Sequence, residues 1–232
     1  MIYTVSDIHG RYDKYRKLLA RIGLGSDDIL YVLGDVLDRG PDGFKILLDM
    51  AQRSNVVCLV GNHEAMAMAA LPGLLNMGQG SNDEAPDAAE LWFHNGGERS
   101  LMDFLTLNAE QMRTAWNYMR AMPLYREVEA GGRQFVLVHG GLGNFSPGRP
   151  LEDYQPRELY WCRPELDTAY YADKLVVLGH TPVQSLRPGA RLLGGPAKII
   201  RTGSFIDIDC GCVFPGGRLG CLCLDTMEEI YV

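Results

Sequence analysis

The hydrophobic positions of the chain fall into short runs separated by polar loops. Five runs of four or five residues are rich in β-branched side chains, and each is followed by a loop that carries Gly or Asp: 2–5, 29–33, 56–60, 135–138 and 175–178. Continuous apolar runs of this length are typical of strands that are buried on both faces. The pattern therefore predicts five buried strands.

Helical spacing connects the first three of these strands. Apolar side chains recur at helical intervals from Tyr12 to Ile22, and Gly23 stands where a glycine commonly ends a helix. Pro41 predicts the first residue of a second helix that runs to about Gln52. The order strand, helix, strand, helix, strand favours parallel pairing with right-handed crossovers, which is an α/β fold.

The alternation stops after residue 65. Residues 72–86 are rich in Gly, Asn, Ser and Asp, so we expect a flexible loop there, followed by two helices. The second of these helices begins with a capping box formed by Asn108 and Gln111, and Pro123 ends it. We interpret residues from about 66 to 122 as a helical insertion into a single domain that spans 1–232.

The second half is rich in β signals, with hairpins predicted at Gly131-Gly132 and Gly216-Gly217. A two-residue turn at the second pair would place Cys212 opposite Cys221 and Cys210 opposite Cys223. A flat ladder is poorly suited to a tetrahedral zinc site, so we expect buried, reduced thiols.

Composition limits the partners. The chain has 232 residues, 47% of them apolar, and a formal net charge of −7, which argues against nucleic-acid polymers and anionic membranes as partners. The longest apolar stretch, 65–77, contains Pro72 and Gly73 and is shorter than the roughly 18 residues that suggest a membrane span. The first residues lack the features of a signal peptide, so we expect a cytoplasmic protein.

Four of the five histidines lie in short motifs at the ends of predicted strands: His9 in SDIHG, His63 in GNHE, His139 in HGG and His180 in GHT. His94 has no such context, and we expect no catalytic role for it. Loops at the carboxyl ends of parallel strands converge on one edge of a sheet. We therefore expect one cluster that contains Asp7, His9, Asp35, Asp38, Arg39, Asn62, His63, His139 and His180.

The donor types in this cluster indicate a metal site. Carboxylate, amide and imidazole donors without a thiolate suit divalent ions such as Mn, Fe or Zn. A carboxylate can bridge two ions that lie roughly 3.5 to 4 Å apart, and Asp35, which is central in order, is our candidate bridge. Two cations would also supply the local positive charge that a net-acidic protein needs to hold a phosphate.

These motifs, DxH, GDxxDR, GNHE, HGG and GHT, resemble those of the calcineurin-like metallophosphoesterases, and more narrowly those of small bacterial and bacteriophage lambda type serine/threonine phosphatases. The resemblance extends from Asp7 to about Leu224 and includes the softer blocks NGGERSL, LYWCR and CVFPGGRL. It implies a central β-sandwich flanked by helices and a cofactor of two divalent ions, with manganese the expected metal.

The resemblance also implies a role for each residue. Asp7, His9 and Asp35 would hold one metal, and Asp35, Asn62, His139 and His180 the other. His63, held by Asp38, would protonate the leaving group. The substrate phosphate would be bound by Arg39, Asn62 and Arg163. Glu64 would support the site rather than bind metal.

The implied reaction is direct attack of a hydroxide, held by the two metals, on phosphoserine or phosphothreonine in proteins or on small phosphoesters. The alternatives are a nucleotide hydrolase on the same scaffold, either a symmetrical diadenosine tetraphosphatase or a 2′,3′-cyclic nucleotide phosphodiesterase, and an inactive binding protein. The complete ligand set argues against the last. GNHE and HGG favour the phosphatase, because diadenosine hydrolases usually have Asp after GNH and Ala after the later His.

Overall fold

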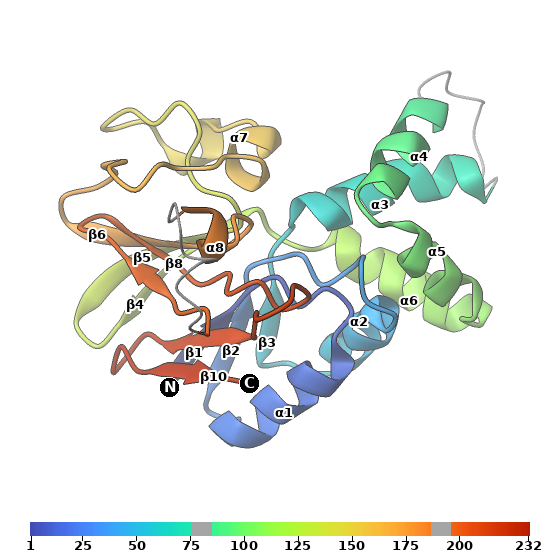
Figure 1. Ribbon diagram of the computed structural model, residues 1–232, viewed down its shortest axis with the longest axis horizontal. Coiled ribbons are helices and arrows are strands. Elements are labelled where there is room, and N and C mark those ends of the chain that lie inside the picture. Colours follow the sequence, from blue (N-terminus) through green and yellow to red (C-terminus); the bar gives the residue numbers. More distant parts are fainter. Residues whose placement is uncertain (76–84, 187–195) are drawn as a thin grey trace.

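The computed structural model describes residues 1–75, 85–186 and 196–232 of the chain (Figure 1). The elements follow in this order: β1 (Ile2–Val5), α1 (Tyr12–Ile22), β2 (Ile29–Val32), α2 (Gly43–Ala51), β3 (Val56–Cys58), α3 (Asn62–Leu74), α4 (Ala85–His94), α5 (Glu98–Leu105), α6 (Ala109–Arg120), β4 (Tyr125–Ala130), β5 (Arg133–Val138), the 3₁₀ turn η1 (Leu151–Asp153), α7 (Pro156–Tyr160), β6 (Lys174–Leu178), α8 (Val183–Leu186), β7 (Ile200–Arg201), β8 (Phe205–Asp207), β9 (Gly220–Cys223) and β10 (Glu229–Tyr231).

The strands form two mixed sheets. The first has the order β10-β9-β1-β2-β3, in which β1, β2 and β3 are parallel as the sequence predicts. The second has the order β4-β5-β6-β8-β7, and its β4–β5 hairpin turns at Gly131-Gly132 as predicted. All five strands predicted from the apolar runs are present, with ends that differ by at most two residues.

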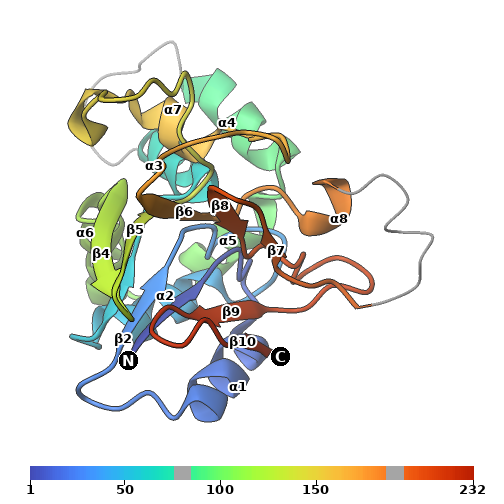
Figure 2. The same cartoon turned by 90° about the vertical axis from the view of Figure 1, so that its left-hand side faces the viewer.

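Three hydrophobic clusters show how the layers pack. In β5, Phe135 and Leu137 lie in one cluster with Leu222 of the first sheet, whereas Val136 and Val138 lie in another cluster with Leu151, Tyr154 and Leu159. Alternate residues of one strand thus face the other sheet and the α7 segment. The third cluster joins the first sheet to α1, α2 and the helices after β3. Figures 1 and 2 show this arrangement, which is the predicted sandwich flanked by helices.

Helix α2 begins two residues later than predicted, so placing Pro41 at its first position was wrong. Its N-cap is Asp42, whose carbonyl accepts the N–H of Ile46. The N–H of Asp42 itself bonds to Gly10 of the neighbouring loop. Asp42 itself has φ of −115° and ψ of 33°, which is outside the helical range, so the helix begins after it.

The helical region differs from its prediction in two ways. Helix α3 continues through Pro72 to Leu74, so part of the expected 72–86 loop is helical, while residues 76–84 lie outside the described part of the chain. Three helices follow instead of two, because Gly96, with φ of +96°, separates α4 from α5. The capping box of Asn108 and Gln111 is confirmed. Within the described residues, no helix has the length and apolar character needed to cross a membrane.

The hairpin predicted at Gly216-Gly217 is not formed. Strand β9 pairs with β1 and β10, and residues 208–219 form an irregular loop after β8. Gly211 has φ of +66° and donates its N–H to the side chain of Asp209, which turns the chain out of an extended path. The proposed cysteine register is therefore wrong, although Cys210, Cys212, Cys221 and Cys223 are buried and free as expected.

Candidate active site

The loops that follow β1 and β2 are joined by backbone hydrogen bonds. The N–H groups of Asp7, His9 and Gly10 donate to the carbonyls of Gly34, Asp35 and Val36 at 3.2, 2.9 and 2.7 Å. Gly34 has φ of +91°, and an added Cβ there would lie 2.9 Å from Nδ1 of His139. These contacts bring the carboxyl ends of both sheets' strands together.

Several of the predicted site residues have an unusual backbone conformation, with positive φ. Eight non-glycine residues among those described have positive φ, and six of them are predicted site residues, with φ between 46° and 71°: Asp7, His9, Asp35, Asp38, Arg39 and His180. Each such conformation costs about 1 kcal/mol or more and persists only where surrounding contacts enforce it. Backbone strain is thus concentrated at the residues that the sequence predicts for the site.

Three imidazoles are oriented by bonds to their Nδ1 atoms. His9 donates to the carbonyl of Leu37 at 2.8 Å, His139 to that of Leu33 at 2.6 Å, and His63 to the carboxylate of Asp38 at 2.6 Å. Each ring therefore turns its Nε2 atom toward the shared centre. Fixing one ring nitrogen in this way is how proteins orient histidine ligands toward a metal.

Asp35 lies between two groups of candidate metal ligands. Its Oδ2 is 3.8 Å from Nε2 of His9 and 3.7 Å from Nε2 of His63, whereas its Oδ1 is 3.2 Å from Nε2 of His139. His180 completes the second group. Burial acts to raise the pKa of Asp35, but His139 and His63 outweigh it and hold that pKa well below its usual value.

The second group contains too many acceptors for a site without a cation. Nε2 of His139 lies 3.0 Å from Oδ1 of Asn62 as well as 3.2 Å from Asp35. Burial lowers the pKa of His139, but Asp35 outweighs it and raises the pKa to about 9, so that a proton fills this place. Nε2 of His180 is buried and has no hydrogen-bond partner among the described residues. Donors arranged in this way fit a divalent ion.

Asp7 lies at the edge of the first group. Its Oδ1 is 3.8 Å from Nε2 of His9, and its Oδ2 accepts the hydroxyl of Ser6 and the N–H of His180. Burial and the charge of Asp35 raise the pKa of Asp7. One carboxylate thus connects the loop after β1 to the loop after β6.

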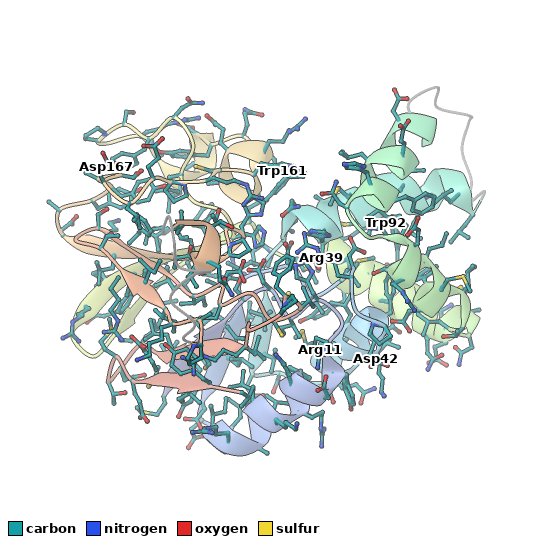
Figure 3. All side chains as sticks on the ribbon, viewed as in Figure 1. Arg11, Arg39, Asp42, Trp92, Trp161 and Asp167 are labelled. Atoms are coloured by element: carbon teal, nitrogen blue, oxygen red, sulfur yellow. The ribbon has the colours of Figure 1, made fainter. Side chains whose placement is uncertain are left out.

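The two predicted phosphate-binding arginines flank the centre from different loops. Arg39 approaches Nε2 of His9 at 2.6 Å and Nε2 of His63 at 3.0 Å. Arg163 donates to the carbonyl of His180 and to the hydroxyl of Thr181, both at 3.1 Å. Figure 3 shows Arg39 in the central region between the helices and the sheets. All ten predicted site residues are therefore gathered at one place.

Comparison with known proteins identifies the family. The family model described as calcineurin-like phosphoesterase matches residues 1–206. The chain belongs to the calcineurin-like phosphoesterase family.

Two curated relatives of this phosphoesterase carry related names. A symmetrical bis(5′-nucleosyl)-tetraphosphatase of Acidovorax sp. (strain JS42) is 31% identical over 147 residues, covering 61% of this chain and 44% of that protein. The chain thus spans less than half of that relative's length. The asymmetrical bis(5′-nucleosyl)-tetraphosphatase PrpE of Geobacillus sp. (strain WCH70) is 27% identical over 100% of this chain and 93% of its own length.

A solved structure supports the fold of the phosphoesterase. The crystal structure of a candidate diadenosine tetraphosphatase superimposes with a TM-score of 0.65 at 20% identity, covering 100% of this chain and 92% of that one.

The two motif positions that favoured a protein phosphatase contact neighbouring backbone in this phosphoesterase. Glu64 is fully buried, and its carboxylate accepts the N–H groups of Asp35, Val36, Leu37 and Gly61 at 2.8 to 3.0 Å. An added Cβ at Gly140 would lie 2.8 Å from the carbonyl oxygen of Cys162. Both positions therefore have a structural reason, which is contact with neighbouring backbone.

Glu64 gives a prediction for stability. Its four donors are shared between both carboxylate oxygens, so the amide of Glu64→Gln would turn an NH₂ group toward two buried N–H groups. We expect the free energy of unfolding to fall by roughly 2–4 kcal/mol, measured by urea unfolding. The matched control is Glu165→Gln at an exposed position, expected within about 0.5 kcal/mol of the parent. Equal stability of both variants would contradict this role.

Sequence reasoning missed several residues that support the phosphoesterase site. Trp92 and Ser100 bond to Asp38, and the ring of Trp161 lies edge-on to His180 with centroids 5.8 Å apart. The only sequence signal for these residues lay in two blocks. NGGERSL contains Ser100 and follows Trp92, and LYWCR contains Trp161. Two buried acids, Asp207 and Asp209, had no motif that would have distinguished them.

Proposed function

We propose that this protein hydrolyses dinucleoside polyphosphates, with a bis(5′-nucleosyl) tetraphosphate as the substrate. The observation that carries the proposal is the full-length similarity to a bis(5′-nucleosyl)-tetraphosphatase, which covers 100% of this chain. Because that relative is of the asymmetrical type and the symmetrical ones match only 61% of this chain, we propose asymmetrical cleavage. The products would be a nucleoside triphosphate and a nucleoside monophosphate.

The donor set would hold two divalent ions, for which we propose manganese. Asp7, His9 and Asp35 would bind one, and Asp35, Asn62, His139 and His180 the other. Such ions act as Lewis acids that activate water and neutralise phosphate charge. His63 also belongs to the first group of candidate ligands, but its bond to Asp38 suits it to proton transfer.

The remaining site residues would bind the polyphosphate and protonate the leaving group. Guanidinium groups match pairs of phosphate oxygens, so Arg39 and Arg163 would bind the polyphosphate from the two sides of the centre. Burial lowers the pKa of His63, but Asp35 and Asp38 outweigh it and raise that pKa, which favours the protonated form. When Arg39 turns from His63 to phosphate, Nε2 of His63 can give its proton to the leaving oxygen as the P–O bond breaks.

An exposed aromatic ring beside Arg39 suits a nucleotide. Phe214 is 41% exposed, and Cζ of Arg39 lies 5.7 Å from its ring centroid. The ring is carried on a turn in which Phe214 bonds to Gly211 and Gly217 at 2.9 Å. A nucleobase can stack on such a ring while the guanidinium binds the adjoining phosphate.

Phe214 gives a prediction for binding. Base stacking contributes about 1–3 kcal/mol, so Phe214→Ala should raise KM for diadenosine tetraphosphate about 10-fold and leave KM for an alkyl phosphate, which has no ring to stack, unchanged. Phe214→Tyr should retain the parent KM. The control is Leu105→Ala, which removes another exposed apolar side chain, at the end of α5. A similar change in KM for both substrates would count against a base-stacking role.

The function is tested on protein loaded with Mn²⁺. Diadenosine tetraphosphate, a phosphoserine peptide and a 2′,3′-cyclic nucleotide are assayed side by side, and nucleotide products are separated by chromatography. We expect the dinucleotide to have the highest kcat/KM and to yield ATP and AMP. Two molecules of ADP would refute asymmetrical cleavage, and a higher kcat/KM for the peptide would refute the proposed substrate.

A further inference from the structure

Trp92 of α4 contacts the carboxylate that orients His63. Its indole N–H lies 3.0 Å from Oδ1 and 2.9 Å from Oδ2 of Asp38, and both side chains are fully buried. Oδ2 also accepts the Nδ1–H of His63 at 2.6 Å. One carboxylate is thus shared between the active site and the helices that follow β3. Figure 3 shows Trp92 on the side of Arg39 that faces these helices.

The segment around Trp92 also holds the backbone of the same loop. The N–H of Asp38 donates to the hydroxyl of Ser100 at 2.7 Å, and the N–H of Arg39 donates to the carbonyl of Gly96 at 3.2 Å. An added Cβ at Gly97 would lie 2.6 Å from atoms of the indole ring, so Trp92 packs directly on this glycine. Residues 92–100, which we name the 92–100 clamp, therefore bind Asp38 through both its side chain and its main chain.

The indole donates to both oxygens of the carboxylate, whereas the bond from His63 goes to Oδ2. Among the described residues, Trp92 is the only hydrogen-bond donor to Oδ1 of Asp38. Removing it would leave a buried acceptor without a partner, and the carboxylate would lose the bond that fixes its rotation about Cβ–Cγ. With the bond in place, Oδ2 points at Nδ1 of His63, and the ring presents Nε2 to the site.

We infer that Trp92 is a positioning residue for His63 and acts through Asp38, so that the 92–100 clamp sets the orientation of the proton donor. The inference deepens the proposed hydrolysis and rests on it for the role of His63. The contacts among Trp92, Asp38 and His63 do not depend on which phosphoester is cleaved. Their consequences can therefore be measured separately from substrate identity.

The test replaces Trp92 with Phe, which keeps an aromatic ring and removes the donor. In protein with ¹⁵N-labelled histidine, we expect the downfield Nδ1–H resonance of His63, assigned by its loss in His63→Gln, to shift or broaden. In Mn²⁺-loaded protein, kcat for phenyl phosphate should fall about 10- to 100-fold, the range for supporting partners of this kind. The loss on p-nitrophenyl phosphate, whose leaving group needs little protonation, should be several-fold smaller, with KM unchanged for both.

Matched variants separate positioning from packing. Trp116→Phe changes a partly buried tryptophan that packs on the same core cluster, and it should leave both readouts at parent values. In an Asp38→Ala background, Trp92→Phe should have no further effect on kcat. If Trp92→Phe does not fold, Ser100→Ala removes the acceptor for the N–H of Asp38 and should shift the same resonance.

The outcomes distinguish this inference from the proposed function. An unchanged His63 resonance in Trp92→Phe, or the full loss of kcat in the Asp38→Ala background, would overturn the role of Trp92. A shifted resonance in a protein that leaves diadenosine tetraphosphate intact would refute the proposed function and support the positioning role. Turnover of the dinucleotide by the parent, together with an unchanged His63 resonance in Trp92→Phe, would support the proposed function and refute the positioning role.

Discussion

Asp35→Asn should remove both bound metal and activity. The two groups of candidate ligands share only this residue, and each of its oxygens faces one of them, 3.2 Å from His139 and 3.7 to 3.8 Å from His63 and His9. An amide has no charge and one acceptor oxygen, so both groups would lose the anion that they share. We expect kcat/KM to fall at least about 1000-fold, which corresponds to about 4 kcal/mol, and metal analysis to find less than one ion per chain.

The control for this variant is Asp167→Asn, which makes the same chemical change at an exposed residue far from Arg39 (Figure 3). It should retain metal and activity at parent values. Two ions per chain in Asp35→Asn, measured by elemental analysis after gel filtration, would refute the shared-ligand role. Activity near the parent value with that full metal content would also exclude Asp35 from catalysis.

Local signals were sufficient for the five strands predicted from apolar runs and for the first helix. Apolar runs identified every strand that carries a site loop, and Gly23, with φ of +56°, ends α1 as predicted. Local signals failed where distant contacts decide the path. Asp42 has a non-helical conformation, with φ of −115° and ψ of 33°, beside the loop whose Gly10 accepts its N–H, so α2 starts after it. Strand β9 pairs with β1, which lies more than two hundred residues earlier.

The sequence predicted which residues form the candidate site, but not the contacts that hold those residues in place. A histidine at a strand end is visible in the sequence, because the motif and the strand are both local. The positive φ values of Asp35, Asp38 and Arg39 are not, since they are imposed by contacts with other loops. Trp92 is distant in sequence from Asp38, and only the folded chain shows that the two side chains touch.

The choice of substrate shows a further limit of motifs. Glu64 and Gly140 suggested a protein phosphatase, yet Glu64 bonds to backbone and Gly140 packs against Cys162. Such contacts give both residues a structural reason that is independent of the substrate. An exposed group beside a proposed phosphate-binding residue, such as Phe214 next to Arg39, is a more direct basis for a proposal about the substrate.

His63→Gln should slow catalysis by an amount that depends on the leaving group. Gln keeps a polar side chain but cannot transfer a proton, and general acid catalysis contributes about 100- to 10,000-fold. An alkyl phosphate releases a basic alkoxide, so its kcat should fall across that range. A leaving nucleotide, whose terminal phosphate has a pKa near about 6, needs little protonation, and neither does p-nitrophenolate. For both of these substrates the loss should be about 10-fold or less.

The matched control is His94→Gln, because His94 is exposed at the end of α4 and is not among the described candidate ligand groups. It should leave every rate at the parent value. Equal losses on all three leaving groups in His63→Gln would show that His63 binds substrate or metal rather than supplying a proton. Metal analysis decides between those two, since a ligand role would lower the metal content and phosphate binding would not. The dependence on leaving group therefore tests the function of the Asp38–His63 pair independently of which phosphoester is the natural substrate.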